Sequence, residues 1–387
     1  MHLADLGAEV IKIEPPSGDY IRRMAFPIID GISLLHWHIN RGKRSLALDL
    51  RRDAGVATFL ALVERSDVVI EAMRPGALDR RGLTYERMST ANPRIVYCHV
   101  TGYGLTGPYR DLPSHGYAYD AWAGVARPTR DEHGLPSIPA YTTVGIHAGP
   151  LYAALGILAA VLRARATGRG CELEVAQSEA AAAFNWNGIE GNKAHERPES
   201  EVTGNDGDGR GGSRRDMGEA TMKDAVRYQF YESADGYVLF MASEREFWKN
   251  FCEAVGRSDL FERHPGAKVA DHARGNLELR RELVEIFRGR TTAEWIELGL
   301  RANVPLGPVN SAKTVAADPQ FVDRLPWLPH ARHGTDLLPS PIRLLGEELP
   351  SPATAPVEPG QDTVDILREV LGYGAAEIEA LRAAGAI

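Results

Sequence analysis

Short apolar runs alternate with stretches of helical spacing through the first part of the chain. The runs predict strands at Ala8–Glu14, Ser45–Leu50, Asp67–Met73 and Arg94–Val100. Helical spacing predicts helices between them, at Ala54–Arg65 and Tyr85–Ala91. Strands that alternate with helices pair in parallel and are joined by crossover helices. The pattern therefore predicts a large α/β domain of Rossmann-like type with a parallel sheet.

The segment Tyr141–Gln177 has a pattern of its own. A Gly-containing turn (YTTVGIHAGP) leads into a long apolar helix in LYAALGILAAVLRARATGRG, which ends in a basic Gly-rich corner. A strand follows at Glu172–Ala176. A strand–turn–helix corner of this kind can place a loop residue at the mouth of a cleft in an α/β sheet. However, no Asp or Glu occurs between Glu132 and Glu172.

The pattern changes beyond Glu190. Residues 201–224 are Gly-rich, charged and without periodicity, which is typical of a loop or linker. Beyond it, two strands flank the hairpin signal Ala234-Asp235-Gly236, and three amphipathic helices follow. We predict a smaller α+β domain at residues 225–325. The large domain is predicted to comprise residues 1–200 and, after the return of the chain, residues 326–387 with two C-terminal helices.

Composition narrows the class of protein. The chain of 387 residues can hold two cores, and 44% hydrophobic with 25% charged residues is ordinary for a soluble globular protein. A formal charge of -8 argues against nucleic-acid binding. The start MHLADLGAEV shows no secretory signal, and the apolar run Gly149–Leu162 is shorter than the ~20 residues that span a bilayer. We expect a cytoplasmic protein without a membrane partner.

Three motifs that could suggest a binding site are interpreted as an ordinary loop or as packed or solvated histidines. GYGLTG at residues 102–107 matches GxGxxG, but Pro108 and a turn follow it, so no helix start is available for a pyrophosphate. The histidine pairs of HWHIN (His36, His38) and HARH (His330, His333) have no Cys or carboxylate at ligand spacing. The cysteines Cys98, Cys171 and Cys252 are also far apart. We predict neither a dinucleotide fingerprint nor a metal site.

Basic residues recur in the early loops, among them Arg22, Arg51, Arg74 and Arg80. They can be solvated loop ends, or they can converge at one end of a parallel sheet and bind phosphates. Spacing alone leaves both interpretations open.

Several motifs in a fixed order carry a resemblance. They are LADLGAEVIKIEPPSGDYIRR, NRGKRS with LALDL, RPGALDRRGLTYE, NPRIVYCHVTGYGLTGPY, GILAAVLRARATGRG and VPLGPVNSAKTVAADPQF. Together they resemble the family III CoA-transferases, which include carnitine CoA-transferase, formyl-CoA transferase and 2-methylacyl-CoA racemase. The resemblance covers nearly the whole chain.

The resemblance implies a Rossmann-like large domain built from both chain ends, a small domain between them, and two interlocked subunits. It implies coenzyme A or an acyl-CoA as substrate, with no permanently bound cofactor. Carried over by motif, Leu48 and Arg51 would line the nucleotide pocket, and Met73 and Arg80 would contact the adenine and phosphate end. Arg22 is a further cofactor-binding candidate. The resemblance thus favours phosphate binding by the basic loops.

In the resembled transferases one Asp carboxylate attacks the acyl thioester and forms a mixed anhydride. An enzyme–CoA thioester follows, which the acceptor acid reopens. The counterpart of this Asp here is Ile146, or Gly145 with the racemase-like spacing. Neither side chain is a nucleophile, so a carboxylate elsewhere, such as Asp120, Asp206 or Asp208, would have to replace it.

Two further differences concern the family pattern. The resembled proteins often carry a carboxylate where Gly116 stands, and the racemases have a His-Asp pair there, of which only His115 is present. His115 is our catalytic candidate for proton transfer, with a plain loop histidine as the alternative; His147 is the other titratable group in the segment. The resembled proteins also have a strand before LADLGAEVIK, so we expect either a start recorded too late or a sheet that lacks a strand.

Three hypotheses follow. The chain is a CoA-transferase acting on a carboxylic acid, or a non-catalytic subunit whose Asp-bearing homologue supplies the nucleophile, or a CoA-thioester racemase, isomerase or lyase that uses His115. A plain acyl-CoA binding protein ranks last. The partners expected are an acyl-CoA, a carboxylic acid, and a second subunit in an interlocked homodimer or heterodimer.

Overall fold

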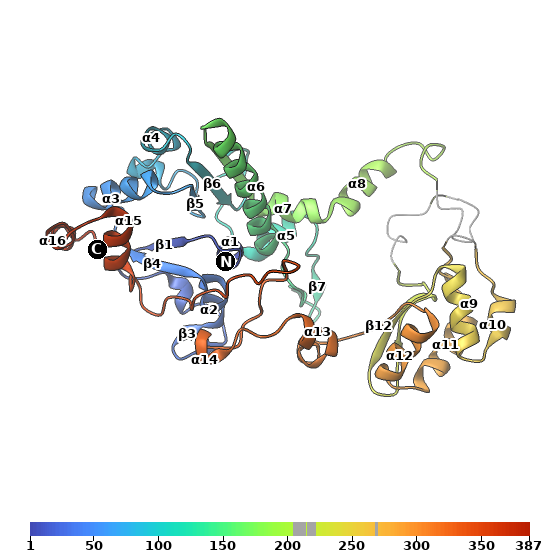
Figure 1. The fold of residues 1–387 in the computed structure, drawn as a ribbon. Helices are drawn as coiled ribbons and strands as arrows, with labels where there is room; N and C mark the ends of the chain where they lie inside the picture. Colours follow the sequence, from blue (N-terminus) through green and yellow to red (C-terminus); the bar gives the residue numbers. More distant parts are fainter. Residues whose placement is uncertain (204–213, 215–221, 268–269) are drawn as a thin grey trace. The chain divides into compact units, whose positions relative to one another are not determined.

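The computed structural model describes residues 1–203, 214, 222–267 and 270–387 (Figure 1). The chain divides into two compact units, one formed by Met1–Trp186 with Leu325–Ile387 and the other by Asn187–Arg324. The predicted candidates Asp206 and Asp208 lie outside the described residues. Each unit has its own hydrophobic core.

Parallel strands form the centre of the first unit. β1 (Val10–Glu14) pairs with β4 (Lys43–Ala47), and β6 (Val96–Thr101) pairs on one side with β5 (Val68–Glu71) and on the other with β9 (Cys171–Ala176). This confirms the α/β class with parallel pairing. The strands nevertheless form two sheets instead of one, because no ladder between described residues joins β1 or β4 to β5.

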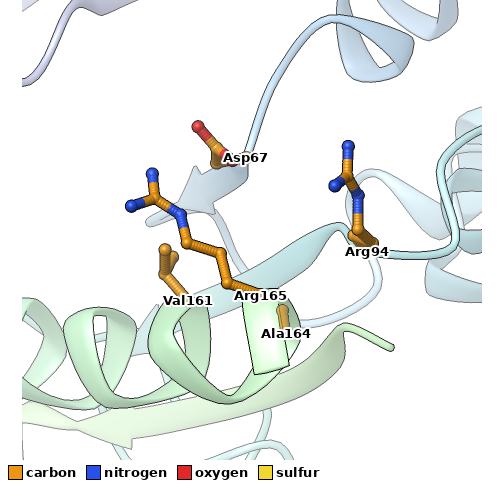
Figure 2. A pocket seen from close by; sticks show the side chains of 5 residues that line it. All are labelled: Asp67, Arg94, Val161, Ala164 and Arg165. Atoms are coloured by element: carbon orange, nitrogen blue, oxygen red, sulfur yellow. The ribbon is translucent and has the colours of Figure 1, made fainter. Parts of the chain in front are cut away.

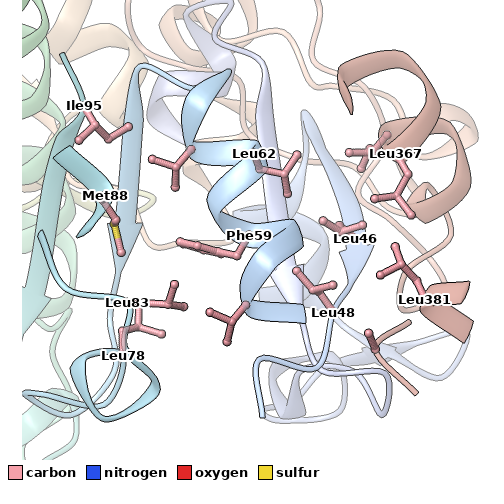
Figure 3. Packing of buried hydrophobic residues seen from close by; sticks show 14 of the residues in the cluster. Leu46, Leu48, Phe59, Leu62, Leu78, Leu83, Met88, Ile95, Leu367 and Leu381 are labelled. Carbon is pink, nitrogen blue, oxygen red and sulfur yellow. The ribbon is translucent and has the colours of Figure 1, made fainter. Parts of the chain in front are cut away.

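Helices from both ends of the chain cover these strands. The core between them contains Leu46, Leu48, Phe59, Leu62, Leu83, Met88 and Leu367 (Figure 3). It is built from α3 (Asp53–Glu64), α4 (Tyr85–Ala91), α15 (Thr363–Leu371) and α16 (Ala375–Ala383). Leucines and a phenylalanine at helical spacing face the strands, so burial of apolar surface stabilises this arrangement.

Shorter elements complete the first unit. They are α1 (His2–Asp5), η1 (Tyr20–Arg22), β2 (Ile28–Ile29), β3 (Ile32–Ser33), α2 (Leu34–Asn40), η2 (Asp79–Arg81), α5 (Gly116–Trp122), β7 (Thr129–Arg130), β8 (Pro136–Ser137), α7 (Gln177–Phe184) and α14 (His330–His333). α8 (Trp186–His195) begins at the boundary between the units.

The apolar helix of the first unit, α6 (Gly145–Thr167), has 23 residues. It is longer than the predicted run and, by length and composition alone, long enough to cross a membrane, so the argument from shortness was wrong. The face with Ala153, Ile157, Ala160 and Ala164 packs on Val96 and Cys98 of the sheet. Small residues on this face let the helix lie close to the strands.

The second unit is α+β. Antiparallel strands β10 (Tyr228–Glu232), β11 (Tyr237–Met241) and β12 (Leu306–Pro308) form its sheet. Its helices are α9 (Arg245–Ala254), α10 (Ser258–Arg263), α11 (Leu277–Arg288), α12 (Thr292–Ala302), η5 (Val315–Ala317) and α13 (Pro319–Arg324). Its core is aromatic, with Phe240, Trp248, Phe251, Phe287 and Trp295 in mutual ring contact. These rings supply large buried areas to a small domain.

A buried ion pair joins β1 to the C-terminal part of the first unit. Arg22 donates from Nη2 to Glu14 at 2.7 Å and from Nη1 to the carbonyl of Pro356 at 2.9 Å. Burial raises the pKa of Glu14, but hydrogen bonds from Arg22, Ser45 and the Asp19 amide outweigh it and hold this pKa at about 2. The carboxylate therefore contributes stability only while it is ionised.

We expect this contribution to disappear in acid. Since the pKa of Glu14 is lowered on folding, the stability is present above pH ~4.5 and is lost as the pH falls toward 2. In urea unfolding at pH 7, Glu14→Gln should lower the free energy of unfolding by about 2 kcal/mol or more. The difference from the wild type should shrink by pH 3. Glu9→Gln, at an exposed surface pair with Arg44, is the control; equal losses in both variants would contradict this expectation.

Candidate functional site

The start of α6 lies at the carboxyl ends of β6 and β9. β6 leads into the Gly-rich loop, whose Gly102 carbonyl accepts a hydrogen bond from the Ser178 amide directly after β9 (3.1 Å). A Cβ atom on Gly145 would stand 2.9 Å from the carbonyl oxygen of Gln177. The first residues of α6 and α7 are therefore in contact where α/β sheets usually bind ligands.

Asp120, on α5, caps α6 from a distance in the sequence. Its Oδ1 accepts from the Gly145 amide at 2.7 Å, and its Oδ2 accepts from the Val144 amide at 2.8 Å and the Tyr141 hydroxyl at 3.0 Å. Burial and this last bond raise the pKa of Tyr141 to about 12, which keeps the hydroxyl a donor. Asp120 is fully buried. Both its oxygens are engaged, so in this conformation it is a helix cap and not an accessible nucleophile.

Ile146, and not Gly145, has room for a functional side chain. Gly145 is buried, and a Cβ atom there would meet Tyr119 Cβ at 2.9 Å and Asp120 Oδ1 at 3.2 Å. The Ile146 side chain is 39% exposed. Of the two predicted counterparts of the family Asp, only position 146 faces solvent at the start of α6.

The two positions that differ from the resembled family are neighbours in space. A Cβ atom on Gly116 would stand 3.1 Å from Cγ2 of Ile146, so the branched side chain fills the space above the glycine. His115, the residue before α5, is exposed beside them. The structure thus brings His115, Gly116 and Ile146 together.

His147 follows Ile146 and is near enough to His38 to affect the pKa of that residue. Burial and the neighbouring Arg41 lower the pKa of His38 to about 4, and the nearby His147 and His2 also lower it. Arg41 is itself held by a buried ion pair with Asp5 at 2.7 Å. Its Nη1 lies 3.2 Å from Nδ1 of His38. His38 is therefore neutral at physiological pH.

The predicted CoA-contacting residues lie in different environments. The Leu48 side chain is buried in the core and only 2% exposed. Only the backbone of Leu48 is therefore available for a contact with a nucleotide. Arg51 is exposed and pairs with Asp49 at 2.8 Å through both Nε and Nη2. The Arg22 guanidinium is buried against Glu14. Its donors are already engaged, which leaves little for a phosphate in this conformation.

Met73 and Arg80 are both exposed after β5, at the carboxyl edge of the sheet. Contact of these two residues with CoA stays a prediction. The small pocket shown in Figure 2 lies at the opposite edge, among Asp67 before β5, Arg94 before β6, and Arg165 near the end of α6. It is separate from the α6 start.

Two of the histidines considered as metal ligands, His36 and His333, are buried. His36 lies 2.8 Å from the Pro356 carbonyl and 3.0 Å from Asn40, and His333 is fully buried on α14. Among the described residues, no group of three or more metal-ligating side chains occurs. The capping role of Asp120 was missed in the sequence, because 24 residues separate it from Val144 and no local motif joins them.

Comparison with known proteins places these features in a family. A model of "CoA-transferase family III" matches residues 1–363. The chain is 30% identical over 394 residues to succinyl-CoA:glutarate CoA-transferase from Homo sapiens, covering 100% of this chain and 85% of that protein. It is 28% identical over 399 residues to the succinyl-CoA–L-malate CoA-transferase beta subunit from Chloroflexus aurantiacus, covering 98% of this chain and 91% of the relative.

A solved structure has the same fold. The crystal structure of Rv3272 from M. tuberculosis superimposes with a TM-score of 0.73 at 25% identity, covering 94% of this chain and 92% of that one. The family match extends over both described units and includes the α6 start. The chain belongs to CoA-transferase family III.

Proposed function

We propose that this protein moves CoA between an acyl-CoA thioester and a carboxylic acid. The observation that carries the proposal is the family match over residues 1–363, which includes the exposed Ile146 position at the start of α6. The carboxyl edge of the sheet also presents Met73 and Arg80 to solvent, which suits a CoA nucleotide. CoA and acyl-CoA are substrates here, with no resident cofactor required.

The names of the similar proteins suggest which substrates to test first. The names of two relatives combine succinyl-CoA with a dicarboxylic acid, glutarate or malate. We therefore propose a CoA thioester of a dicarboxylic acid as the donor to test first. The acceptor is then a second acid of similar charge.

A second candidate is a subunit whose partner supplies the nucleophile. Asp120, the described carboxylate that was considered as a replacement nucleophile, has both oxygens engaged. One relative is named as a beta subunit.

An exposed apolar stripe on α6 is a surface that such a partner can cover. Its side chains, which recur at helical spacing, are Leu151, Leu155, Leu158 and Leu162. We propose that a second, related chain covers this stripe in a dimer; sedimentation of the purified protein as a monomer only would contradict the dimer.

The transfer assay tests both candidates. The purified chain is mixed with succinyl-CoA and labelled glutarate, and glutaryl-CoA is measured with and without any homologue that co-purifies. We expect transfer at a substantial rate only when an Asp-bearing chain is present. Full activity of this chain alone would contradict the subunit proposal and leave the transferase proposal intact. Absence of transfer under both conditions would contradict the transferase proposal for this acid pair.

His115→Ala in the same assay addresses the racemase, isomerase or lyase alternative. A general base at position 115 would make the variant ~10²-fold or more slower. We expect a loss of less than tenfold, because His115 is exposed and lacks an acidic neighbour at Gly116. A larger loss, together with α-proton exchange in deuterated water, would favour His115 catalysis.

A further inference from the structure

Two arginines from different loops meet above Gly76. Gly76 follows β5 with a φ of +71°, in the loop that continues into η2. The position of a Cβ atom on Gly76 would be 3.4 Å from Nη1 of Arg80 and 3.8 Å from Nη2 of Arg110. Arg80 belongs to η2 after β5, and Arg110 belongs to the Gly-rich loop after β6. The carboxyl ends of adjacent parallel strands thus bring two guanidinium groups to one point.

The charges around this point leave donors available. Asp79 Oδ2 lies 3.8 Å from the same position above Gly76. Arg110 uses Nη1 to bond both oxygens of the exposed Asp111, at 3.0 and 3.3 Å. Its Nη2 points toward Gly76 instead. No hydrogen bond or ion pair engages the Arg80 guanidinium within the described part of the chain.

The carboxylates of Asp79 and Asp111 offset part of the positive charge here, but the Arg80 guanidinium and Nη2 of Arg110 keep donors for a further anion. A phosphate matches this arrangement, because its oxygens accept from two guanidinium groups at once and in planar, paired geometry. The lack of a side chain at Gly76 leaves the space over the loop open to such a group. Carboxylates are smaller acceptors with less charge, so phosphate is the ligand that this pair fits better.

We propose that Arg110 binds a phosphate group of CoA jointly with Arg80, over Gly76. This inference rests on the proposed function and adds a residue that the motif comparison did not provide. Arg110 is a binding residue, remote from the thioester. It connects the Gly-rich loop after β6 to the nucleotide end of the substrate, so the loop is held in place when CoA is bound.

Calorimetric titration of the full chain tests the proposal with three ligands: CoA, 3′-dephospho-CoA and pantetheine. Arg110→Met should weaken CoA binding about tenfold, which corresponds to ~1.4 kcal/mol, and should leave pantetheine binding unchanged. Arg80→Met should act similarly. The double variant should lose less than the sum of both, since the two groups share one phosphate. Arg94→Met, before β6 at the opposite edge of the sheet, is the matched control.

The outcomes separate the proposals. If dephospho-CoA is insensitive to Arg110→Met, the 3′-phosphate is the group bound; if it is weakened too, the diphosphate is. Either result supports the proposal. If the wild type binds CoA and Arg110→Met binds it as tightly as Arg94→Met does, the Arg110 inference is wrong and the proposed function stands. If the wild type binds no CoA, the proposed function itself fails, and the role of Arg110 with it.

Discussion

Replacing Asp120 by Ala is expected to destabilise the start of α6 by about 3 kcal/mol. The change leaves the amides of Val144 and Gly145 and the hydroxyl of Tyr141 without their acceptor. Gly145 is buried, so water does not replace the lost oxygen there without opening the helix. Amide hydrogen exchange in the peptide that contains residues 141–152 should therefore accelerate about 100-fold, while the second unit is unaffected.

Two variants control this result. Asp120→Asn keeps the size of the side chain and one carbonyl oxygen, so it should lose about half as much. Asp111→Ala removes an exposed carboxylate from the preceding loop and should change the stability by less than about 0.5 kcal/mol. Equal exchange rates in Asp120→Ala and Asp111→Ala would show that the cap does not stabilise α6.

The parallel pairing could be predicted because its signal is local. Val-Ile-Lys-Ile in β1 and Val-Tyr-Cys-His-Val in β6 are short apolar runs bounded by helices, and such runs pair in parallel. The two-sheet arrangement could not be predicted in the same way. Whether β1 and β5 are joined depends on backbone partners far away in the sequence, and periodicity carries no information about those partners.

In the candidate site, too, local features could be predicted from the sequence and long-range contacts could not. The Tyr141–Gln177 segment and position 146 could be identified from motifs, because motif order is a property of the chain itself. The Asp120 cap and the meeting of Arg80 with Arg110 depend on contacts across 24 or more residues. The first residues of α6 were predicted as a turn, because Gly145, Gly149 and Pro150 are residues typical of turns, but they belong to the helix.

Replacing Ile146 by Asp is expected to give this chain a covalent acyl intermediate. The new carboxylate would stand at the second residue of α6, where the helix dipole favours a negative charge, on a position that is 39% exposed. Asp is smaller than Ile, so the contact with Gly116 is relieved and the oxygens can approach a bound thioester. With succinyl-CoA, hydroxylamine trapping followed by mass spectrometry should detect modification at position 146 in the variant and none in the wild type.

The rate of CoA transfer should rise at least about 10²-fold in Ile146→Asp, because a nucleophile held next to the bound thioester reacts as if at high concentration. The Ile146→Asn side chain has nearly the same shape as Asp and is polar, but it carries no anionic oxygen. This variant should therefore neither form a trapped adduct nor accelerate transfer. If Asp and Asn behave alike while CoA still binds, a carboxylate at position 146 does not reach the thioester in this chain. The nucleophile would then have to come from the partner subunit or from a different segment, and the start of α6 would serve binding alone.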